Sequence, residues 1–85
     1  MTIQIHVRLA EPFWRVIGER ELELTLAADA TVAGLLGRLG ELYPDLVSEL
    51  RQTPPHVFVG DTEADSEARL IDGDRVHLVW PIAGG

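Results

Sequence analysis

A single helical stripe stands between stretches of strand-like alternation, and this feature limits the fold more than any other. Apolar residues between positions 32 and 42 recur at intervals of three and four, which is the period of one helix face; they are Val32, Leu35, Leu36, Leu39 and Leu42. Thr31 precedes the stripe as an N-cap, and Pro44 disfavours helical geometry at Tyr43, where we expect the helix to end. One such helix covers one face of a sheet, so the sequence predicts a two-layer α+β domain.

Three glycines lie on the predicted helix face opposite the leucines: Gly34, Gly37 and Gly40. Each costs about 1 kcal/mol relative to alanine at an exposed interior position, so tertiary packing has to hold this helix. Glycines also permit close approach of a neighbouring element. We interpret all three as tolerated sequence drift and assign no function to them.

Alternation of apolar and polar residues predicts the strands. Residues 2–9 and 21–26 alternate with a period of two, which is typical of half-buried strands, and we expect them to pair as an antiparallel hairpin. Residues 56–59 form a brief apolar strand. Residues 75–80 form the last one, and Pro81 ends its hydrogen bonding.

The connecting segments carry further signals. Residues 10–20 are too apolar for an open loop, and we interpret their apolar side chains as a lid over one end of the core: Phe13, Trp14, Val16 and Ile17. Residues 45–51 predict a short helical turn. The acidic run 60–68 predicts a solvated loop with at most a two-residue strand. Residues 70–71 are expected to touch the core, and residues 72–74 predict a tight turn.

This order of elements predicts a ubiquitin-like β-grasp fold, in which a mixed sheet of four or five strands carries one main helix across one face. The first and last strands then lie side by side in the middle of the sheet. The opposite face is left open, and we expect it to meet a partner through His6, Arg8, Phe58, His77 and Val79.

The side-chain inventory excludes several functions. The 85 residues include 14 acidic and 7 basic ones, and the net charge of −7 argues against nucleic acid and favours a basic protein surface as partner. There is no cysteine, which removes disulfides and cysteine nucleophiles and fits a reducing compartment, so we expect a cytoplasmic protein. No signal peptide, transmembrane segment or membrane partner is predicted. All seven basic residues are arginines, so the chain offers no side-chain amine for acylation.

Catalysis and metal binding are not predicted either. His6 and His77 could lie together on the open face, but two histidines without a third ligand rarely make a metal site. The sequence also lacks a glycine loop of the kind that cradles phosphate. We therefore predict no catalytic residue, no metal and no permanently bound cofactor.

The last five residues, 81–85, are predicted to form a slender, flexible tail after a β-grasp domain of residues 1–80. Gly84 and Gly85 carry no side chains and follow any backbone path, which suits threading into a narrow channel of another protein. Pro81 limits the entropy lost on ordering, because it fixes one φ angle. We expect four tail residues to enter such a channel ahead of the terminal glycine: Pro81, Ile82, Ala83 and Gly84.

Several motifs in this order resemble the MoaD/ThiS family of ubiquitin-like sulfur carriers. They are the helix segment 30–36 with Leu42-Tyr43-Pro44, the strand 57–59, the turn 70–76 and the Gly-Gly ending. Residues 7–13 with Gly18 are closer to the CysO-like branch, a carrier in cysteine biosynthesis. The chain departs from the family at Gly60-Asp61 and Trp80-Pro81, which bears on the partner's identity more than on the fold.

The resemblance implies a carrier and not an enzyme. The carboxylate of Gly85 would be adenylated by a ubiquitin-activating-like adenylyltransferase that uses ATP, and a sulfur donor enzyme would convert it to a thiocarboxylate for a sulfur-accepting biosynthetic enzyme of molybdopterin, cysteine or a similar pathway. Two other interpretations stay open. The chain could be a protein modifier joined through Gly85 to target lysines, or a plain interaction module with an inert tail.

Overall fold

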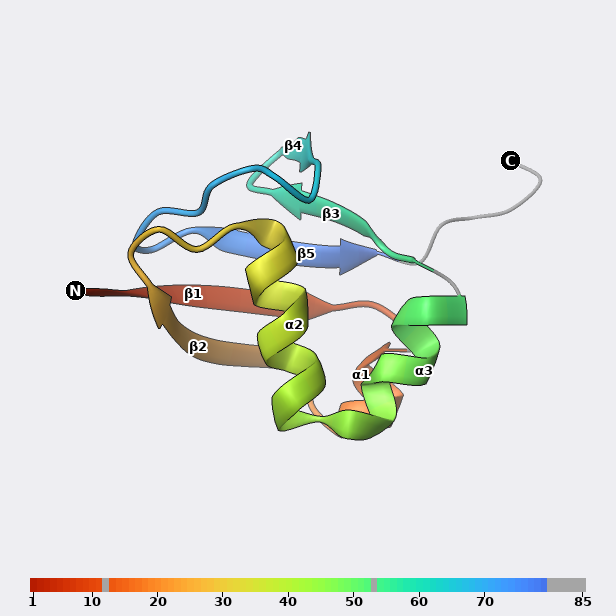
Figure 1. Ribbon diagram of the computed structural model, residues 1–85. Coiled ribbons are helices and arrows are strands. Elements are labelled where there is room, and N and C mark those ends of the chain that lie inside the picture. The colour runs from red at the N-terminus through yellow and green to blue at the C-terminus, as the bar shows by residue number, and fades with distance from the viewer. Residues whose placement is uncertain (12, 53, 80–85) are drawn as a thin grey trace.

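The computed structural model describes residues 1–11, 13–52 and 54–79, which form a five-stranded sheet with three helices on one side (Figure 1). Helix α2 crosses the sheet, while α1 and α3 lie near each other at one end of it. The elements in chain order are β1 (Thr2–Leu9), α1 (Phe13–Ile17), β2 (Glu21–Ala27), α2 (Val32–Leu42), α3 (Pro44–Gln52), β3 (His56–Val59), β4 (Thr62–Ala64) and β5 (Arg75–Val79).

The strands follow the order β2-β1-β5-β3-β4, so the first and last strands lie side by side at the centre. Strand β1 pairs with β2 antiparallel and with β5 parallel, and β3 is antiparallel to both β5 and β4. This arrangement confirms the predicted α+β, ubiquitin-like β-grasp fold. The sheet has five strands, because the acidic run forms a three-residue strand β4 where at most two residues were expected.

Alternation along the strands builds the core. Every second residue of β1 is buried, and so are the three leucines of β2 and the two inward residues of β5. Helix α2 covers them with Val32, Leu35 and Leu39, none of which is more than 1% exposed. Full burial of one such side chain stabilises the fold by roughly 1.5–3 kcal/mol. Two members of the predicted stripe are not fully buried: Leu36 packs partly against the core, and Leu42, the last member, is 43% exposed.

Local signals set the ends of α2. The Thr31 hydroxyl accepts a hydrogen bond from the Gly34 amide at 3.2 Å, which confirms the predicted N-cap. At the other end the Tyr43 amide donates to the Leu39 carbonyl at 2.8 Å. Pro44 then begins a new helix, as proline does well at a first helical position where its missing N–H is not needed.

Two segments are more helical than the sequence suggested. Residues 44–52 form a nine-residue helix and not a short turn, and Leu46 on that helix is fully buried. Residues 13–17 form one short helix inside the predicted connection. Its Phe13 is fully buried and Trp14 packs partly against the core, which confirms that this segment is a lid over one end.

The tight turn at residues 72–74 fixes the start of β5 against β1. The Gln4 amide donates to Asp72 Oδ1 at 2.7 Å, and the Gly73 amide donates to the Gln4 carbonyl at 2.8 Å. Gly73 has a φ of +86°, a backbone region that side chains disfavour. Just before the turn Leu70 is buried, but Ile71 is 68% exposed, so only the first of these two residues touches the core as predicted.

Candidate protein-interaction surface

The sheet face opposite the helices is covered by no part of the chain that the structure describes. Because side chains alternate along a strand, the residues between the buried ones point to this open face. From the two central strands they are Gln4, His6, Arg8, Arg75, His77 and Val79; from β2, β3 and β4 they are Glu21, Glu23, Thr25, His56, Phe58 and Glu63.

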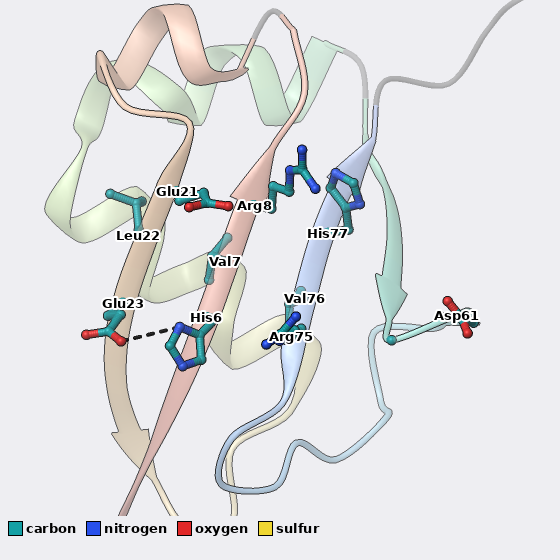
Figure 2. Close-up of a pocket in the computed structure, with 11 residues that line it drawn as sticks. His6, Val7, Arg8, Glu21, Leu22, Glu23, Asp61, Arg75, Val76 and His77 are labelled. Atoms are coloured by element: carbon teal, nitrogen blue, oxygen red, sulfur yellow. Dashed lines mark ion pairs between the residues drawn. The ribbon is translucent and has the colours of Figure 1, made fainter.

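One row of side chains runs across all five strands. Its order, fixed by the strand register, is Glu21, Arg8, His77, Phe58 and Glu63. Arg8 and His77 lie next to each other on the two central strands (Figure 2). The row therefore places basic groups at its centre and a carboxylate at each end.

A second row lies beside the first, two residues away along each strand, and again places basic side chains next to a glutamate. It begins with Glu23 and continues through His6 to Arg75, whose carbonyl accepts a hydrogen bond from the Gly60 amide at 2.9 Å. His6 Nδ1 lies 3.3 Å from Glu23 Oε1, and both side chains are more than half exposed. Such an exposed pair contributes little to stability.

The two rows line an open groove of about 580 Å³ (Figure 2). Arg8, Arg75, His6 and His77 occupy its middle, while Glu21, Glu23 and Asp61 stand at its edges. The groove is a shallow surface feature over the sheet, and its charged lining suits contact with another polar surface.

An apolar area adjoins the groove on the β3 side. Phe58 and Val79 are half-buried and point to the open face. Beside them His56 Nδ1 lies 2.7 Å from Glu63 Oε2, which ties β3 to β4 on that face. Aromatic and aliphatic side chains next to charged groups are typical of protein interfaces.

A second hollow of about 550 Å³ lies where β1 and β5 end, and Arg8 and His77 border it too. On its far side Arg20 Cζ is 4.6 Å from the centre of the Trp14 ring, a cation–π contact. Arg15 Cζ lies 5.5 Å from the same ring, and its guanidinium also pairs with Glu11 at 2.9 Å. Trp14 was predicted only as part of the lid, and its stacking with two arginines was not predicted.

All five residues predicted for the partner face point to the open side of the sheet. His6 and Arg8 are exposed, and Phe58, His77 and Val79 are half-buried. His6 and His77 are not directly opposite each other, because the register pairs each of them with an arginine. Within the described ranges no group of three or more histidines, cysteines or carboxylates could hold a metal ion.

The predicted tail lies outside the described residues, as does Trp80. Strand β5 ends at Val79, and because β1 and β5 are parallel this end lies beside the C-terminal end of β1. There the Ala10 amide donates to the Leu78 carbonyl at 3.0 Å. The boundary at residue 80 and the roles of residues 81–85 stay predictions.

Arg75 and Asp61 line the groove but were not among the predicted residues of the partner face. Arg75 had a usable signal, since it alternates with His77 on the last strand. Asp61 had none, because its place beside the groove depends on how the turn after β3 folds. No helix among the described residues is long and apolar enough to cross a membrane.

No model of a protein family matches the chain, and no curated protein sequence matches it. Several solved structures do match the chain. The crystal structure of SAMP1 from Haloferax volcanii has a TM-score of 0.84 at 23% identity, over 96% of this chain and 99% of that one. The solution structure of the HVO 2177 protein of the same organism has a TM-score of 0.83 at 29% identity, over 99% and 88%.

A third structure is the complex of subunits 1 and 2 of molybdopterin-converting factor from Helicobacter pylori, matched with a TM-score of 0.69 at 25% identity over 98% of this chain and 100% of that one. These likenesses and the sheet order define a ubiquitin-like β-grasp protein. The match to a chain of this complex supports the resemblance to the MoaD/ThiS family. Membership of the CysO-like branch stays a prediction.

Proposed function

We propose that the chain is a sulfur carrier whose Gly85 carboxylate is adenylated and then converted to a thiocarboxylate. The observation that carries the proposal is a β-grasp body that resembles the MoaD/ThiS family and is followed, shortly after β5, by Gly84-Gly85 in the sequence. The body offers an interaction face, and the two glycines offer an unhindered carboxyl group.

The chemistry needs outside enzymes, because a carboxylate is a poor electrophile. An oxygen of the Gly85 carboxylate attacks the α-phosphorus of ATP, and pyrophosphate leaves. The terminal sulfur of a persulfide on the donor enzyme then attacks the acyl carbon, and AMP leaves. A cysteine thiol of the donor enzyme attacks the resulting acyl disulfide at the donor sulfur and forms a disulfide with it, so that the terminal sulfur stays on Gly85 as the thiocarboxylate. The 85 residues contain no cysteine that could act as nucleophile, so a ubiquitin-activating-like adenylyltransferase and a sulfur donor enzyme perform these steps.

The end of the last strand supports the same proposal. Val79 ends β5 on the open face, close to the Arg8 and His77 end of the groove. A partner that binds this face therefore stands next to the end of β5, after which the sequence continues to Gly85. Ordering each tail residue in a partner's channel costs roughly 1–2 kcal/mol, which weakens binding and favours release to the next enzyme. The acceptor is proposed to be a biosynthetic enzyme, as in the two-subunit molybdopterin-converting factor.

The likeness to SAMP1 favours a second candidate function, that of a protein modifier. Another crystal structure of the Haloferax volcanii protein calls it small archaeal modifier protein 1. In this function the activated Gly85 would be joined to a lysine of a target protein. Both candidates share the adenylation step and differ in the nucleophile that takes the acyl group. The chain has no lysine of its own, so it could tag a target singly but could not extend lysine-linked chains.

Intact-mass measurement of the protein purified from its native host tests the proposal. The carrier predicts a species heavier by the difference between one sulfur and one oxygen atom, and this species must be absent from a Gly85 deletion variant. A population that carries only the ordinary carboxylate, even after incubation with the cognate activating enzyme, ATP and a sulfur donor, contradicts it.

The modifier candidate has its own signature. The last arginine is Arg75 and the chain has no lysine, so trypsin would leave residues 76–85 attached to a modified target lysine. Peptides with this remnant in a host digest would favour the modifier. Their absence alongside the sulfur-containing species would favour the carrier alone.

A further inference from the structure

The centre of the open face is rich in basic residues, although the chain as a whole is acidic. The chain carries a net charge of −7, yet four basic residues of β1 and β5 lie together down the middle of the sheet. We call these residues the basic stripe: His6, Arg8, Arg75 and His77. Carboxylates border the stripe on both sides: Glu21 and Glu23 on β2, and Asp61 after β3 (Figure 2). Glu63 on β4 adds a carboxylate on the β3 side.

The strand register brings basic side chains together along the β1–β5 seam. His6 lies opposite Arg75, and Arg8 lies opposite His77. The β1–β2 pairs on the same face join a basic residue to an acidic one, with His6 opposite Glu23 and Arg8 opposite Glu21. Neither arginine therefore has a carboxylate opposite it across the β1–β5 seam.

The two arginines of the stripe are also unengaged. Arg8 and Arg75 are exposed, and no carboxylate of the described chain lies within 4.0 Å of either guanidinium. By contrast Arg15 pairs with Glu11 at 2.9 Å, and Arg38 pairs with Glu41 at 3.4 Å. An incoming carboxylate therefore meets two free guanidiniums, each of which can hold it with two hydrogen bonds.

The surroundings of the stripe favour a protein as its ligand. Half-buried Phe58 and Val79 adjoin it, which adds apolar contact area that a small anion would not use. The carboxylates on both borders repel the continuous phosphate backbone of a nucleic acid. The groove is open and spans several strands, so it suits an extended polypeptide.

From this pattern we propose that the basic stripe docks an acidic segment of the partner protein, with carboxylates facing Arg8 and Arg75 and basic or neutral residues facing the two acidic borders. The proposal rests on the carrier function and adds the chemistry of the partner's surface. It differs from the expectation of a basic partner surface, which was drawn from the net charge alone. Charge complementarity of this kind sets specificity and the rate of encounter.

A titration followed by ¹H–¹⁵N correlation spectra at low salt tests the proposal on the unmodified protein. Hexaglutamate is the probe, and hexalysine and a polyphosphate of matched length are the comparisons. We expect hexaglutamate to shift the amide signals at residues 6, 8, 75 and 77 in a saturable way, although the protein itself is acidic. Hexalysine should shift signals of the borders and of other acidic surfaces instead.

Two variants with equal charge change give the matched control. The double variant Arg8→Gln/Arg75→Gln should weaken hexaglutamate binding by about tenfold, since it removes two charge-assisted contacts. Arg51→Gln/Arg69→Gln removes two exposed arginines outside the stripe and should keep the affinity within about twofold, because neither side chain lines the groove. Dispersed spectra of both variants show that they are folded.

Three results would overturn the proposal: no shift at the stripe, equal weakening by both double variants, or tighter binding of polyphosphate than of hexaglutamate. None of them bears on sulfur transfer, because the titration does not involve Gly85. Conversely, a chain that never carries a thiocarboxylate but binds hexaglutamate at the stripe would contradict the carrier function and leave the acidic docking segment in place.

Discussion

Gly40 of α2 lies against Val47 of α3, and a β-carbon at Gly40 would come within 3.1 Å of Val47 Cγ2. The structure therefore corrects the interpretation of all three helix glycines as sequence drift. Gly40 lets the two helices approach closely, while a β-carbon at Gly37 would meet no atom within 4 Å. Gly40 could not be distinguished from Gly34 and Gly37 in the sequence, because helix α3 was predicted only as a short turn.

This difference predicts different changes in stability for two alanine substitutions. Gly37→Ala should raise the free energy of unfolding by up to about 1 kcal/mol, since alanine favours the helix and no contact is lost. Gly40→Ala should be less stable than Gly37→Ala by about 1 kcal/mol, because Val47 has to move to admit the methyl group. Urea unfolding measures both. Equal stabilisation by the two alanines would show that the α2–α3 contact is not tight.

The turn before β5 predicts a second stability effect. Asp72→Ala removes the acceptor of the Gln4 amide and should lower the free energy of unfolding by about 1–2 kcal/mol, as expected for a hydrogen bond to a charged group. Asp61→Ala deletes an equal charge at a position with no side-chain hydrogen bond among the described residues and serves as the control. Thermal unfolding should separate the two variants, and coincident melting curves would contradict the role of Asp72.

The ion pair between His56 and Glu63 predicts a small effect. Both side chains are more than half exposed, at 52% and 57%, so solvent screens the pair despite its short distance. Glu63→Gln should change the free energy of unfolding by less than about 1 kcal/mol. A larger loss in urea unfolding would mean that β4 depends on this contact.

Phe58 provides a functional prediction for the open face. Phe58→Ala should lower the rate of ATP-dependent activation by the cognate adenylyltransferase by about tenfold, because a large aromatic side chain next to charged groups is the kind of residue that dominates interface energetics. Leu42→Ala removes a partly exposed apolar side chain at the end of α2 and should leave the rate unchanged. Pyrophosphate release measures the rate. A loss that is equal for both variants would contradict a role for the open face.

Much of the fold could be predicted because local and global signals agree. Alternation in residues 2–9 and a brief apolar run in residues 56–59 located two strands with their observed bounds, and Thr31 and Pro44 located the ends of the main helix. The helices α1 and α3 were underestimated because each is short and gains its stability from packing, through Phe13 and Leu46, and not from a long periodic pattern.

The candidate site could be predicted only in part for a related reason. Which residues share the open face follows from alternation, and all five predicted ones lie there. Which of them are neighbours depends on the register between strands far apart in sequence, and His6 therefore meets Arg75 and not His77. The basic stripe, in which His6 pairs with Arg75 and Arg8 with His77, can be recognised only once the register of β1 against β5 is known.

A labelling experiment tests the carrier function most directly, because the chain has no cysteine. Iodoacetamide should therefore find no thiol on protein produced without a cognate activating enzyme, and should add one carboxamidomethyl group only after incubation with that enzyme, ATP and a sulfur donor. The carrier function predicts a single addition that fragmentation locates at Gly85, and that is lost when Gly85 is deleted or ATP is omitted. No addition in the complete reaction, with pyrophosphate release proving that activation occurred, would contradict it.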